Sequence, residues 1–287
     1  MKQNLILSRN GPESLHIEWL DCKETKNWDL ITLFYEESAF ENRIAKDLYQ
    51  AHYMPGGKWD TYHNFLSENL ELINDYDYIW FPDDDISISG DDISKMFVLM
   101  KEFDLDIGQP SMSLESYFSY LVLIQCSGLR LRFSNFAEVM APCLRNNVVT
   151  EMLPFFEGSF TGMGLESIWC FKTRKEPNKI AIFDEINMTH TRPIGGPLHK
   201  KMYDMNMTPN LEIKNNLSKL NVKQVKPVIF SSITKKENQK LSKIKTTMMM
   251  FKEYYGRRKE FKDNKKILSR IRRLLKYHLI YRIKPIF

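Results

Sequence analysis

The stretch "YIWFPDDDISISG", residues 78–90, decides how the rest of the chain is interpreted. Its first four residues predict a short buried strand, and Pro82 follows before three adjacent aspartates, Asp83, Asp84 and Asp85. Ligands of open α/β sheets gather beyond the carboxyl ends of the strands. Carboxylates at that edge suit a hard divalent cation, Mg²⁺ or Mn²⁺, which would also relieve their mutual repulsion. The alternative is a solvated acidic loop that leads into the next helix.

The composition predicts a folded protein without a membrane span. The chain has 287 residues, of which 43% are hydrophobic and 13% aromatic, which is enough for one large domain with a core. No apolar run approaches the length of about 18 residues needed to span a membrane, and the N-terminal run is too short for a signal peptide, so we expect a cytosolic protein. The four cysteines form no CxxC pair, which favours reduced core thiols over a zinc site or a disulfide framework.

The formal net charge of +5 conceals two different parts of the chain. Residues 235–287 contain 18 Lys/Arg and 4 Asp/Glu, a balance of +14, which leaves −9 for residues 1–234. An acidic body therefore carries a basic C-terminal segment.

Strand-like and helix-like stretches alternate through the acidic body, which is typical of an α/β layer fold. We expect one such domain over residues 1–225 and a basic helical extension over 226–287. Asp91 is a candidate N-cap for the helix after residue 90, and Arg130 and Arg132 alternate with apolar residues and are expected to face solvent. Strands are expected over 5–8, 30–35, 76–81, 129–133 and 179–183. A helix is expected over 58–73, with Trp59, Tyr62, Leu66, Leu70 and Ile73 on its buried stripe.

The aspartate segment resembles the Asp-x-Asp signature of nucleotide-sugar-dependent glycosyltransferases with the GT-A fold. "GMGLES" (162–167) is similar to the glycine-rich turn and acidic residue that many of these enzymes place beside the acceptor. "NMTH" (187–190) ends in a histidine after a late strand, where a third metal ligand often lies. The resemblance implies a GT-A-like (Rossmann-like) mixed sheet flanked by helices, with a C-terminal helical extension.

A more extensive resemblance is to an uncharacterised domain family that is inferred to contain glycosyltransferases. Its plant members are labelled lysine-ketoglutarate reductase trans-splicing related, and it also occurs in bacteria. The resemblance covers about residues 7–170 in order and rests on "SRNG" with "SLHIEWL", "GGKW", "YDYIWFPDDDI", "QPSMSLESYFS", "LRFSNFAEVMAPC" and "GMGLES".

The resemblance and the local pattern together suggest a metal and donor site. Residues i and i+2 of an extended chain point the same way, so Asp83 and Asp85 could share one cation while Asp84 turns aside. The family pattern implies His190 as a third ligand, although a lone histidine is more often a surface or core residue. The residues expected to bind the donor are Ser8, Arg9, Lys58, Asp83, Asp84 and Arg192.

Two of these donor residues have a specific physical rationale. Lys58 follows two glycines at a helix start, where backbone N–H groups and an ammonium suit a diphosphate. The guanidinium of Arg192 could bind a phosphate with two parallel hydrogen bonds. A solvated lysine and a surface-loop arginine are the respective alternatives.

The acceptor side is expected around Glu166, the candidate general base that would take the proton of the attacking hydroxyl. Such a base suits an inverting enzyme, and the alternative is that Glu166 only caps its helix. Gly164 would allow a close approach of acceptor and backbone. Gln109, Tyr117 and Glu138 are expected to line the pocket with Gly164, and Glu138 in the apolar "FAEVMAP" would be costly to bury without a partner.

The C-terminal "NKKILSRIRRLLKYHLIYRIKPIF" (264–287) predicts a basic amphipathic helix. Such a helix can lie in the headgroup region of an anionic membrane. The alternative is a helix that packs on the body or on another subunit. No RNA-binding signature is present, so a nucleic-acid partner is not expected. The predicted apolar stripe contains Leu268, Ile271, Leu275 and Leu279, with Ile267 and Leu274 beside it.

These observations predict a metal-dependent glycosyltransferase that uses Mn²⁺ or Mg²⁺. It would move a sugar from a nucleotide-sugar donor to a glycan or lipid-linked acceptor at the inner face of the membrane, in bacterial capsule or lipopolysaccharide synthesis. One alternative is a metal-dependent sugar-phosphate transferase or hydrolase that uses the same aspartates. Another is a non-enzymatic protein that binds membranes or polyanions through its basic segment.

Overall fold

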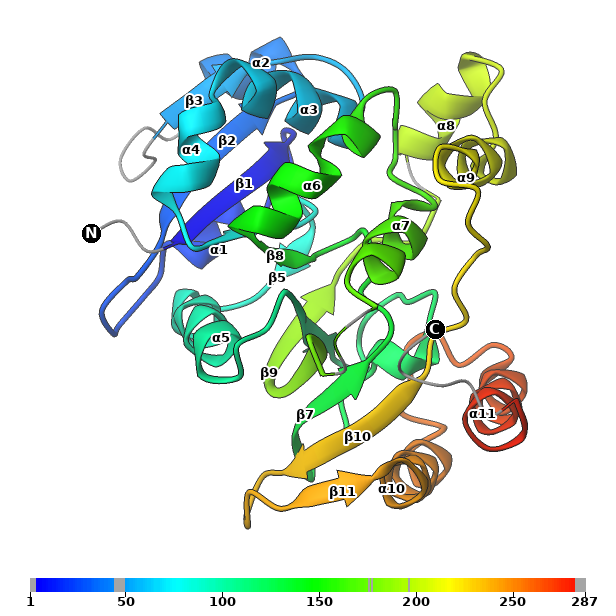
Figure 1. Cartoon of the computed structure of the whole chain (residues 1–287). Coiled ribbons are helices and arrows are strands. Elements are labelled where there is room, and N and C mark those ends of the chain that lie inside the picture. Colours follow the sequence, from blue (N-terminus) through cyan, green and yellow to red (C-terminus); the bar gives the residue numbers. More distant parts are fainter. Residues whose placement is uncertain (1–3, 44–49, 175, 177, 196, 282–287) are drawn as a thin grey trace.

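A computed structural model describes residues 4–43, 50–174, 176, 178–195 and 197–281 of the chain. A mixed β-sheet runs through the molecule, with helices packed on both of its faces (Figure 1). The strands are β1 (Asn4–Asn10), β2 (Asp29–Phe34), β3 (Gln50–Tyr53), β4 (Tyr78–Trp80), β5 (Ile86–Ser87), β6 (Ile107–Met112), β7 (Leu129–Ser134), β8 (Cys143–Arg145), β9 (Ile180–His190), β10 (Ile229–Thr234) and β11 (Lys240–Ser242).

The helices are named in chain order, with two short turns apart from them. A 3₁₀ turn covers Leu121–Leu123, and a π-helical turn covers Lys276–Ile280. The α-helices are α1 (His16–Trp19), α2 (Glu37–Glu41), α3 (Lys58–Glu68), α4 (Leu70–Asp75), α5 (Gly90–Glu102), α6 (Asn146–Phe156), α7 (Leu165–Lys172), α8 (Pro197–Asp204), α9 (Pro209–Ser218), α10 (Lys243–Gly256) and α11 (Ile267–Leu275).

The order of the strands confirms the expected α/β fold class. The order across the sheet is β11-β10-β7-β9-β6-β8-β4-β1-β2-β3, and β5 joins it by pairing with β9. β3, β2, β1 and β4 are parallel, whereas β8 is inserted antiparallel between β4 and β6. The result is a mixed sheet flanked by helices, followed by further helices toward the C-terminal end of the chain.

Both faces of the central strand β1 are covered, which explains its unbroken apolar run. Leu5 and Leu7 belong to one core cluster, with residues of α3, α4, α6 and α7. Ile6 points the other way, into a second cluster with residues of α1, α5, α10 and α11. A parallel strand buried on both faces reads as a continuous hydrophobic run rather than an alternating one.

The expected helix over 58–73 is two helices, because the chain turns at Asn69. Asn69 has non-helical backbone angles, and its side-chain amide donates to the carbonyl of Phe65 at 2.8 Å. A local hydrogen bond of this kind competes with helix continuation. Leu70 is therefore not on the buried stripe, and it is 53% exposed.

The N-cap of α5 is Ser89 rather than Asp91. The hydroxyl of Ser89 accepts a hydrogen bond from the backbone N–H of Asp92 at 3.1 Å. Asp91 lies one residue inside the helix region, and its carboxylate accepts from the backbone N–H groups of Lys23 and Glu24. Serine and aspartate are comparable caps, so the pattern alone did not distinguish these positions.

The two arginines of β7 do not face solvent as expected, because β7 lies inside the sheet between β9 and β10. Arg132 is fully buried and pairs with Asp184, with Nε 2.7 Å from one carboxylate oxygen and Nη2 2.8 Å from the other. Arg130 is half-buried and pairs with Glu102 and Glu185.

The segment after residue 225 is not wholly helical. It first adds β10 and β11 to the main sheet, and its helices begin with α10. In α11, Ile267, Ile271 and Leu274 pack into a core cluster, whereas Leu268 is exposed. This part of α11 therefore packs on the body of the protein, which was the alternative to membrane binding. Residues 282–287 of the expected helix lie outside the described residues. Along the part of the chain that the structure describes, no helix has both the length and the apolar composition needed to cross a membrane.

Candidate metal centre and adjoining carboxylates

The strand pairing brings the aspartate segment against a histidine more than a hundred residues away in the sequence. The three aspartates leave the carboxyl end of β4, and the chain then forms β5, in which Ile86 pairs with His190 at the end of β9. The main-chain carbonyl of Asp85 accepts from the N–H of Thr191 at 3.1 Å and from its hydroxyl at 2.9 Å. The backbone therefore holds Asp85 and His190 together independently of their side chains.

Asp83, Asp85 and His190 form a candidate metal site. One ligand atom from each residue lies within 4.8 Å of the other two. Nε2 of His190 is 3.2 Å from Oδ2 of Asp85. Nδ1 of His190 lies 2.8 Å from the carbonyl oxygen of Tyr117, to which it donates, and this contact directs Nε2 into the cluster.

An unpartnered oxygen in the cluster indicates that a cation fits there. Among the described residues, Oδ1 of Asp85 is buried and has no hydrogen-bond partner. A buried carboxylate oxygen without a donor is costly, and a bound cation would supply the missing contact. Two carboxylates and one imidazole suit Mn²⁺ and also accommodate Mg²⁺, which prefers oxygen ligands.

His190 responds strongly to the carboxylates around it. Burial alone would lower the pKa of His190, but the hydrogen bond and charge of Asp85, together with the charge of Asp83, raise this pKa to about 9. The imidazole is therefore protonated at neutral pH when only the carboxylates face it. A cation must displace that proton in order to bind Nε2.

Asp84 turns away from the candidate metal ligands, as the alternation predicted. One carboxylate oxygen accepts from the N–H of Gly11 at 2.9 Å and from the hydroxyl of Tyr35 at 3.2 Å, and the other lies 3.2 Å from Nη1 of Arg192. Burial raises the pKa of Asp84 to about 6, and Arg192 opposes that rise. Arg192 also donates to the carbonyl of Glu13, so the two side chains join the loop after β1 to the loop after β9.

Lys58 is buried rather than solvated, and it supports the acidic segment from beneath. Its Nζ lies 2.6 Å from Oδ1 of Asp83. The same ammonium contacts the carbonyl oxygens of Phe81, Val139 and Met140 at 2.9–3.2 Å. All of these contacts are to protein oxygens, so the expected contact of Lys58 with a diphosphate stays a prediction.

Ser8 and Arg9 lie buried at the carboxyl end of β1. The hydroxyl of Ser8 donates to the side chain of Asn10 at 2.6 Å. The guanidinium of Arg9 donates to the carbonyls of Met54 at 2.5 Å and Gly56 at 2.7 Å, which holds the loop that precedes α3. Burial lowers the pKa of Arg9 to about 10, so it remains charged at neutral pH.

Glu138 and Glu166 are two further buried carboxylates. Burial raises the pKa values of Glu138 and Glu166 to about 7 each. The charge of His190 opposes the rise in the pKa of Glu138, and the charge of Glu166 adds to it. One oxygen of Glu166 accepts from the N–H of Gly164 at 2.9 Å, and Gly164 has the positive φ of +98° that favours glycine.

Gln109 and Glu138 leave a complementary pair of polar atoms unused. Oε1 of Gln109 accepts from the backbone N–H of Glu138 at 2.7 Å. Nε2 of Gln109 and Oε2 of Glu138 are both buried and, within the described residues, have no hydrogen-bond partner. Both atoms are enclosed by protein, and together they offer one hydrogen-bond donor and one acceptor. Tyr117 contributes its carbonyl to His190, while its ring lies under the ammonium of Lys262 at 4.6 Å.

The sequence did not indicate that α9 holds the glycine-rich loop in place. Glu212 is buried and accepts from the N–H of Thr161 at 2.8 Å, from the N–H of Gly162 at 3.1 Å and from two hydroxyls. Asn216 donates to the hydroxyl of Ser159 and to the carbonyl of Met163, both at 2.9 Å. Both polar residues sit on a helix whose sequence would equally suit a solvated surface, so no local pattern distinguished them.

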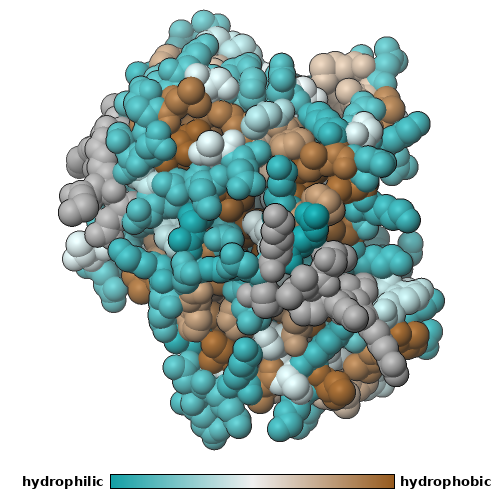
Figure 2. All heavy atoms as spheres, viewed as in Figure 1, coloured by the Kyte–Doolittle hydropathy of each residue, from teal (hydrophilic) through white to brown (hydrophobic). Residues whose placement is uncertain are grey.

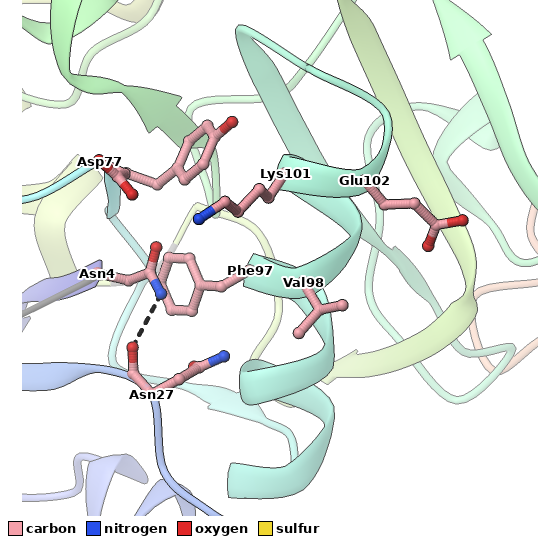
Figure 3. Close-up of a pocket in the computed structure, with 8 residues that line it drawn as sticks. Asn4, Asn27, Asp77, Phe97, Val98, Lys101 and Glu102 are labelled. Atoms are coloured by element: carbon pink, nitrogen blue, oxygen red, sulfur yellow. Dashed lines mark hydrogen bonds between the residues drawn. The ribbon is translucent and has the colours of Figure 1, made fainter.

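A separate surface pocket lies at the other edge of the sheet (Figure 3). Asn4 at the start of β1 and Asp77 just before β4 line it from the sheet side, and Phe97, Val98 and Lys101 line it from α5. The side-chain amide of Asn4 donates to the carbonyl of Asn27 across it at 2.8 Å. The pocket is at the amino ends of the strands, so it is not part of the candidate metal site.

Comparison with known proteins leaves the family unassigned. No family model matches the chain, and no curated protein matches it in sequence. Among solved structures, TarS residues 1–349 from S. aureus, in complex with UDP-GlcNAc, aligns with 98% of this chain and 91% of its own, at 8% identity and a TM-score of 0.46. A second TarS structure from S. aureus aligns with 76% of this chain and 44% of its own, at 7% identity and a TM-score of 0.43. A197 from STIV aligns with 66% of this chain and 85% of its own, at 14% identity and a TM-score of 0.40. Likenesses at these TM-scores carry no information about function.

Proposed function

We propose that the protein is a metal-dependent glycosyltransferase that moves a sugar from a nucleotide-sugar donor to a hydroxyl of a glycan or lipid-linked acceptor. The observation that carries this proposal is the cluster of Asp83, Asp85 and His190, with the unpartnered Oδ1 of Asp85. Mn²⁺ or Mg²⁺ bound there would stabilise the negative charge of the departing diphosphate as a Lewis acid.

The donor side of the proposed site is supported by residues that hold the acidic segment in place. Lys58 fixes Asp83 through its 2.6 Å ion pair, so that one carboxylate is oriented before any ligand arrives. Arg192 and Asp84 tie the loops on both sides of the segment together. We place the nucleotide diphosphate beside these residues, with Ser8 and Arg9 at the end of β1. Preorganised charges of this kind stabilise a transition state without reorganising during the reaction.

The acceptor side of the proposed site is centred on Glu166 as the general base. Its pKa of about 7 suits a group that must take a proton near neutral pH. Gly164 orients the carboxylate through its N–H, and the free atoms of Gln109 and Glu138 are available to bind an acceptor hydroxyl. A base that deprotonates the attacking hydroxyl is consistent with inversion at the anomeric carbon.

The basic C-terminal segment supports an acceptor that is carried by a lipid. We propose that the protein acts at the inner face of a bacterial membrane, in the synthesis of capsule or lipopolysaccharide. The support is the +14 balance of residues 235–287 beside an acidic body.

The test is a thermal-denaturation screen of nucleotide sugars with and without Mn²⁺. A ligand that binds only the native state raises its apparent stability, by about 2.7 kcal/mol at a concentration of about 100 times Kd. We expect one nucleotide to stabilise the wild-type chain only with Mn²⁺, and Asp85→Asn to lose that effect. Asp77→Asn is the matched control, since Asp77 precedes the same strand at its opposite end.

Analysis of the products distinguishes the proposal from its alternatives. Formation of a glycoside supports the transferase, whereas sugar phosphate or free phosphate without a glycoside supports a phosphotransferase or hydrolase at the same cluster. If no nucleotide stabilises the protein and Asp85→Asn leaves its biological function intact, the glycosyltransferase proposal is wrong.

A further inference from the structure

Helix α10 has a second apolar face that points away from the protein. Thr246, Thr247, Met250 and Tyr254 are buried against the body. Ile244, Met248 and Tyr255 are 65%, 51% and 46% exposed. Phe251 lies between them, half-buried and stacked on Tyr255 with a ring separation of 5.6 Å.

These four residues form one continuous outward stripe, which we name the α10 stripe: Ile244, Met248, Phe251 and Tyr255. Their spacing of four, three and four residues places them above one another on one side of a helix. Figure 2 shows hydrophobic side chains at the surface at the lower right, in the region of α10 and α11. Packing of the opposite face of α10 on the body leaves Ile244, Met248 and Tyr255 exposed, whereas Phe251 is half-buried and also contacts the core cluster.

Much of the apolar side predicted for the C-terminal helix is used in packing within the protein. In α11, Ile271 and Leu274 from the predicted apolar side are buried in the core of the protein. In α11 itself only Leu268 of the predicted apolar side is exposed, at 46%, and Leu279 and Ile280 in the turn after it are 41% and 68% exposed. The α10 stripe has three exposed apolar residues along one helix.

The charges around the α10 stripe are predominantly positive. Lys245 and Lys252 are exposed on one flank of the stripe, and within the described residues their ammonium groups make no ion pair. The nearby acidic side chains are already bound by the protein itself: Glu253 by the N–H of Ser127 at 3.0 Å and by Arg257, Glu260 by Arg257 at 2.8 Å, and Asp263 by Arg270 at 3.0 Å.

We propose that the α10 stripe docks the protein on an anionic phospholipid surface, with the four side chains at the boundary between headgroups and acyl chains. Lys245 and Lys252 would contact the lipid phosphates. This inference rests on the membrane association within the proposed function and identifies the surface responsible for it. Apolar insertion and attraction between lysines and anionic headgroups add together in interfacial helices.

The charge of this surface argues against two other occupants. A second copy of the chain docked on the same face would bring two basic surfaces together, which is unfavourable. A nucleic acid would satisfy the lysines, but its phosphate backbone offers no apolar partner for Ile244 and Met248. A lipid surface satisfies both parts of the face.

The test is flotation of the full chain with vesicles of phosphatidylcholine alone or mixed with phosphatidylglycerol, without metal or nucleotide. We expect binding to the anionic vesicles and a loss of binding at high salt. Ile244→Ser with Met248→Ser should lower the partition coefficient by about tenfold or more, because two apolar side chains no longer insert. Lys245→Glu with Lys252→Glu should lower it on anionic vesicles by a similar factor.

Matched controls come from apolar residues that are equally exposed elsewhere. Val98 on α5 and Leu70 on α4 are 55% and 53% exposed, and Val98→Ser with Leu70→Ser should leave vesicle binding within about twofold of the wild type. An unchanged thermal midpoint of each variant shows that it folds. If a serine variant does not fold, Tyr255→Ser replaces it in the same assay.

Three results would overturn the proposal. The first is that the wild type does not bind anionic vesicles. The second is that the α10 variants bind them as strongly as the wild type does. The third is that the wild type is a dimer in solution and the serine variant is a monomer. Because the assay uses neither metal nor donor, its outcome does not depend on transferase activity. Loss of nucleotide binding with intact vesicle binding would instead refute the proposed reaction and leave the α10 surface in place.

Discussion

Binding of a divalent cation should release one proton from His190, and the strength of binding should follow from the pKa of that residue. With a pKa of about 9, about 1% of the imidazole is neutral at pH 7. The cation then binds about 100-fold more weakly at pH 7 than above pH 9, a difference of about 2.7 kcal/mol. The affinity for the cation falls as the pH falls, because the proton and the cation compete for the same lone pair of Nε2.

Isothermal titration calorimetry with Mn²⁺ measures both consequences. The apparent association constant should rise about tenfold per pH unit between about pH 7 and 9. Titrations in buffers with different ionisation enthalpies should show about one proton released per bound ion at pH 7. His190→Gln removes the titrating group, so we expect weaker binding with a nearly flat pH dependence over the same interval.

The control is His63→Gln, because His63 lies on α3 and its ring contacts the side chain of the neighbouring Asn64 at 3.2 Å. This variant should retain the full pH dependence of the wild type. Binding of Mn²⁺ without proton release, or an equally steep pH dependence in His190→Gln, would refute the assignment of His190 as a ligand.

Three further predictions concern stability and are checked by equilibrium urea denaturation. Glu212→Ala should lower the free energy of unfolding by about 1–3 kcal/mol or more, because the buried hydrogen-bond donors of residues 159–162 lose their acceptor. A decrease smaller than about 1 kcal/mol would contradict this role of the carboxylate. Asp184→Asn should lower the free energy of unfolding by about 3–5 kcal/mol, because it leaves the charge of Arg132 buried without its partner. An unchanged free energy of unfolding would contradict the importance of this ion pair. Burial lowers the pKa of His278 to about 4, so the unfolded chain binds more protons than the folded chain between about pH 4 and 6.5. The contribution of His278 to the free energy of unfolding is complete above that interval and falls by about 1.4 kcal/mol per pH unit as the pH drops through it. In His278→Gln the free energy of unfolding should depend less steeply on pH over the same interval.

The strands of the acidic body could be predicted because their signals are local. Residues 5–8, 30–35 and 179–183 are largely apolar runs, and they coincide with parts of β1, β2 and β9 to within one residue at the ends. The break at Asn69 could not be predicted in the same way, because it depends on a side-chain hydrogen bond to Phe65 that competes with an otherwise helical pattern.

The part of the candidate site that lies in one short segment of the chain could be predicted from the sequence. Three adjacent aspartates after a buried strand indicate a cation site from sequence alone, and the i, i+2 rule separates Asp84 from its neighbours. The contribution of Glu212 was not predictable, because a carboxylate on a polar helix has the same local pattern whether it faces solvent or a buried loop. Arg132 was wrongly expected to face solvent, and the burial of Lys58 was not predicted, for the same reason: a charged side chain carries no local mark of burial.

The sequence by itself determined the α/β class, the acidic segment at the end of a strand and the division into an acidic body and a basic end. These properties follow from periodicity and composition, which involve only neighbouring residues. Only the tertiary structure decided that His190 meets Asp85, that Lys58 is buried beneath Asp83 and that α10 rather than most of α11 presents an exposed apolar face. The physical reason is that strand pairing and helix packing join residues far apart in the chain, and burial on one face of a helix is settled by its partner rather than by its own sequence.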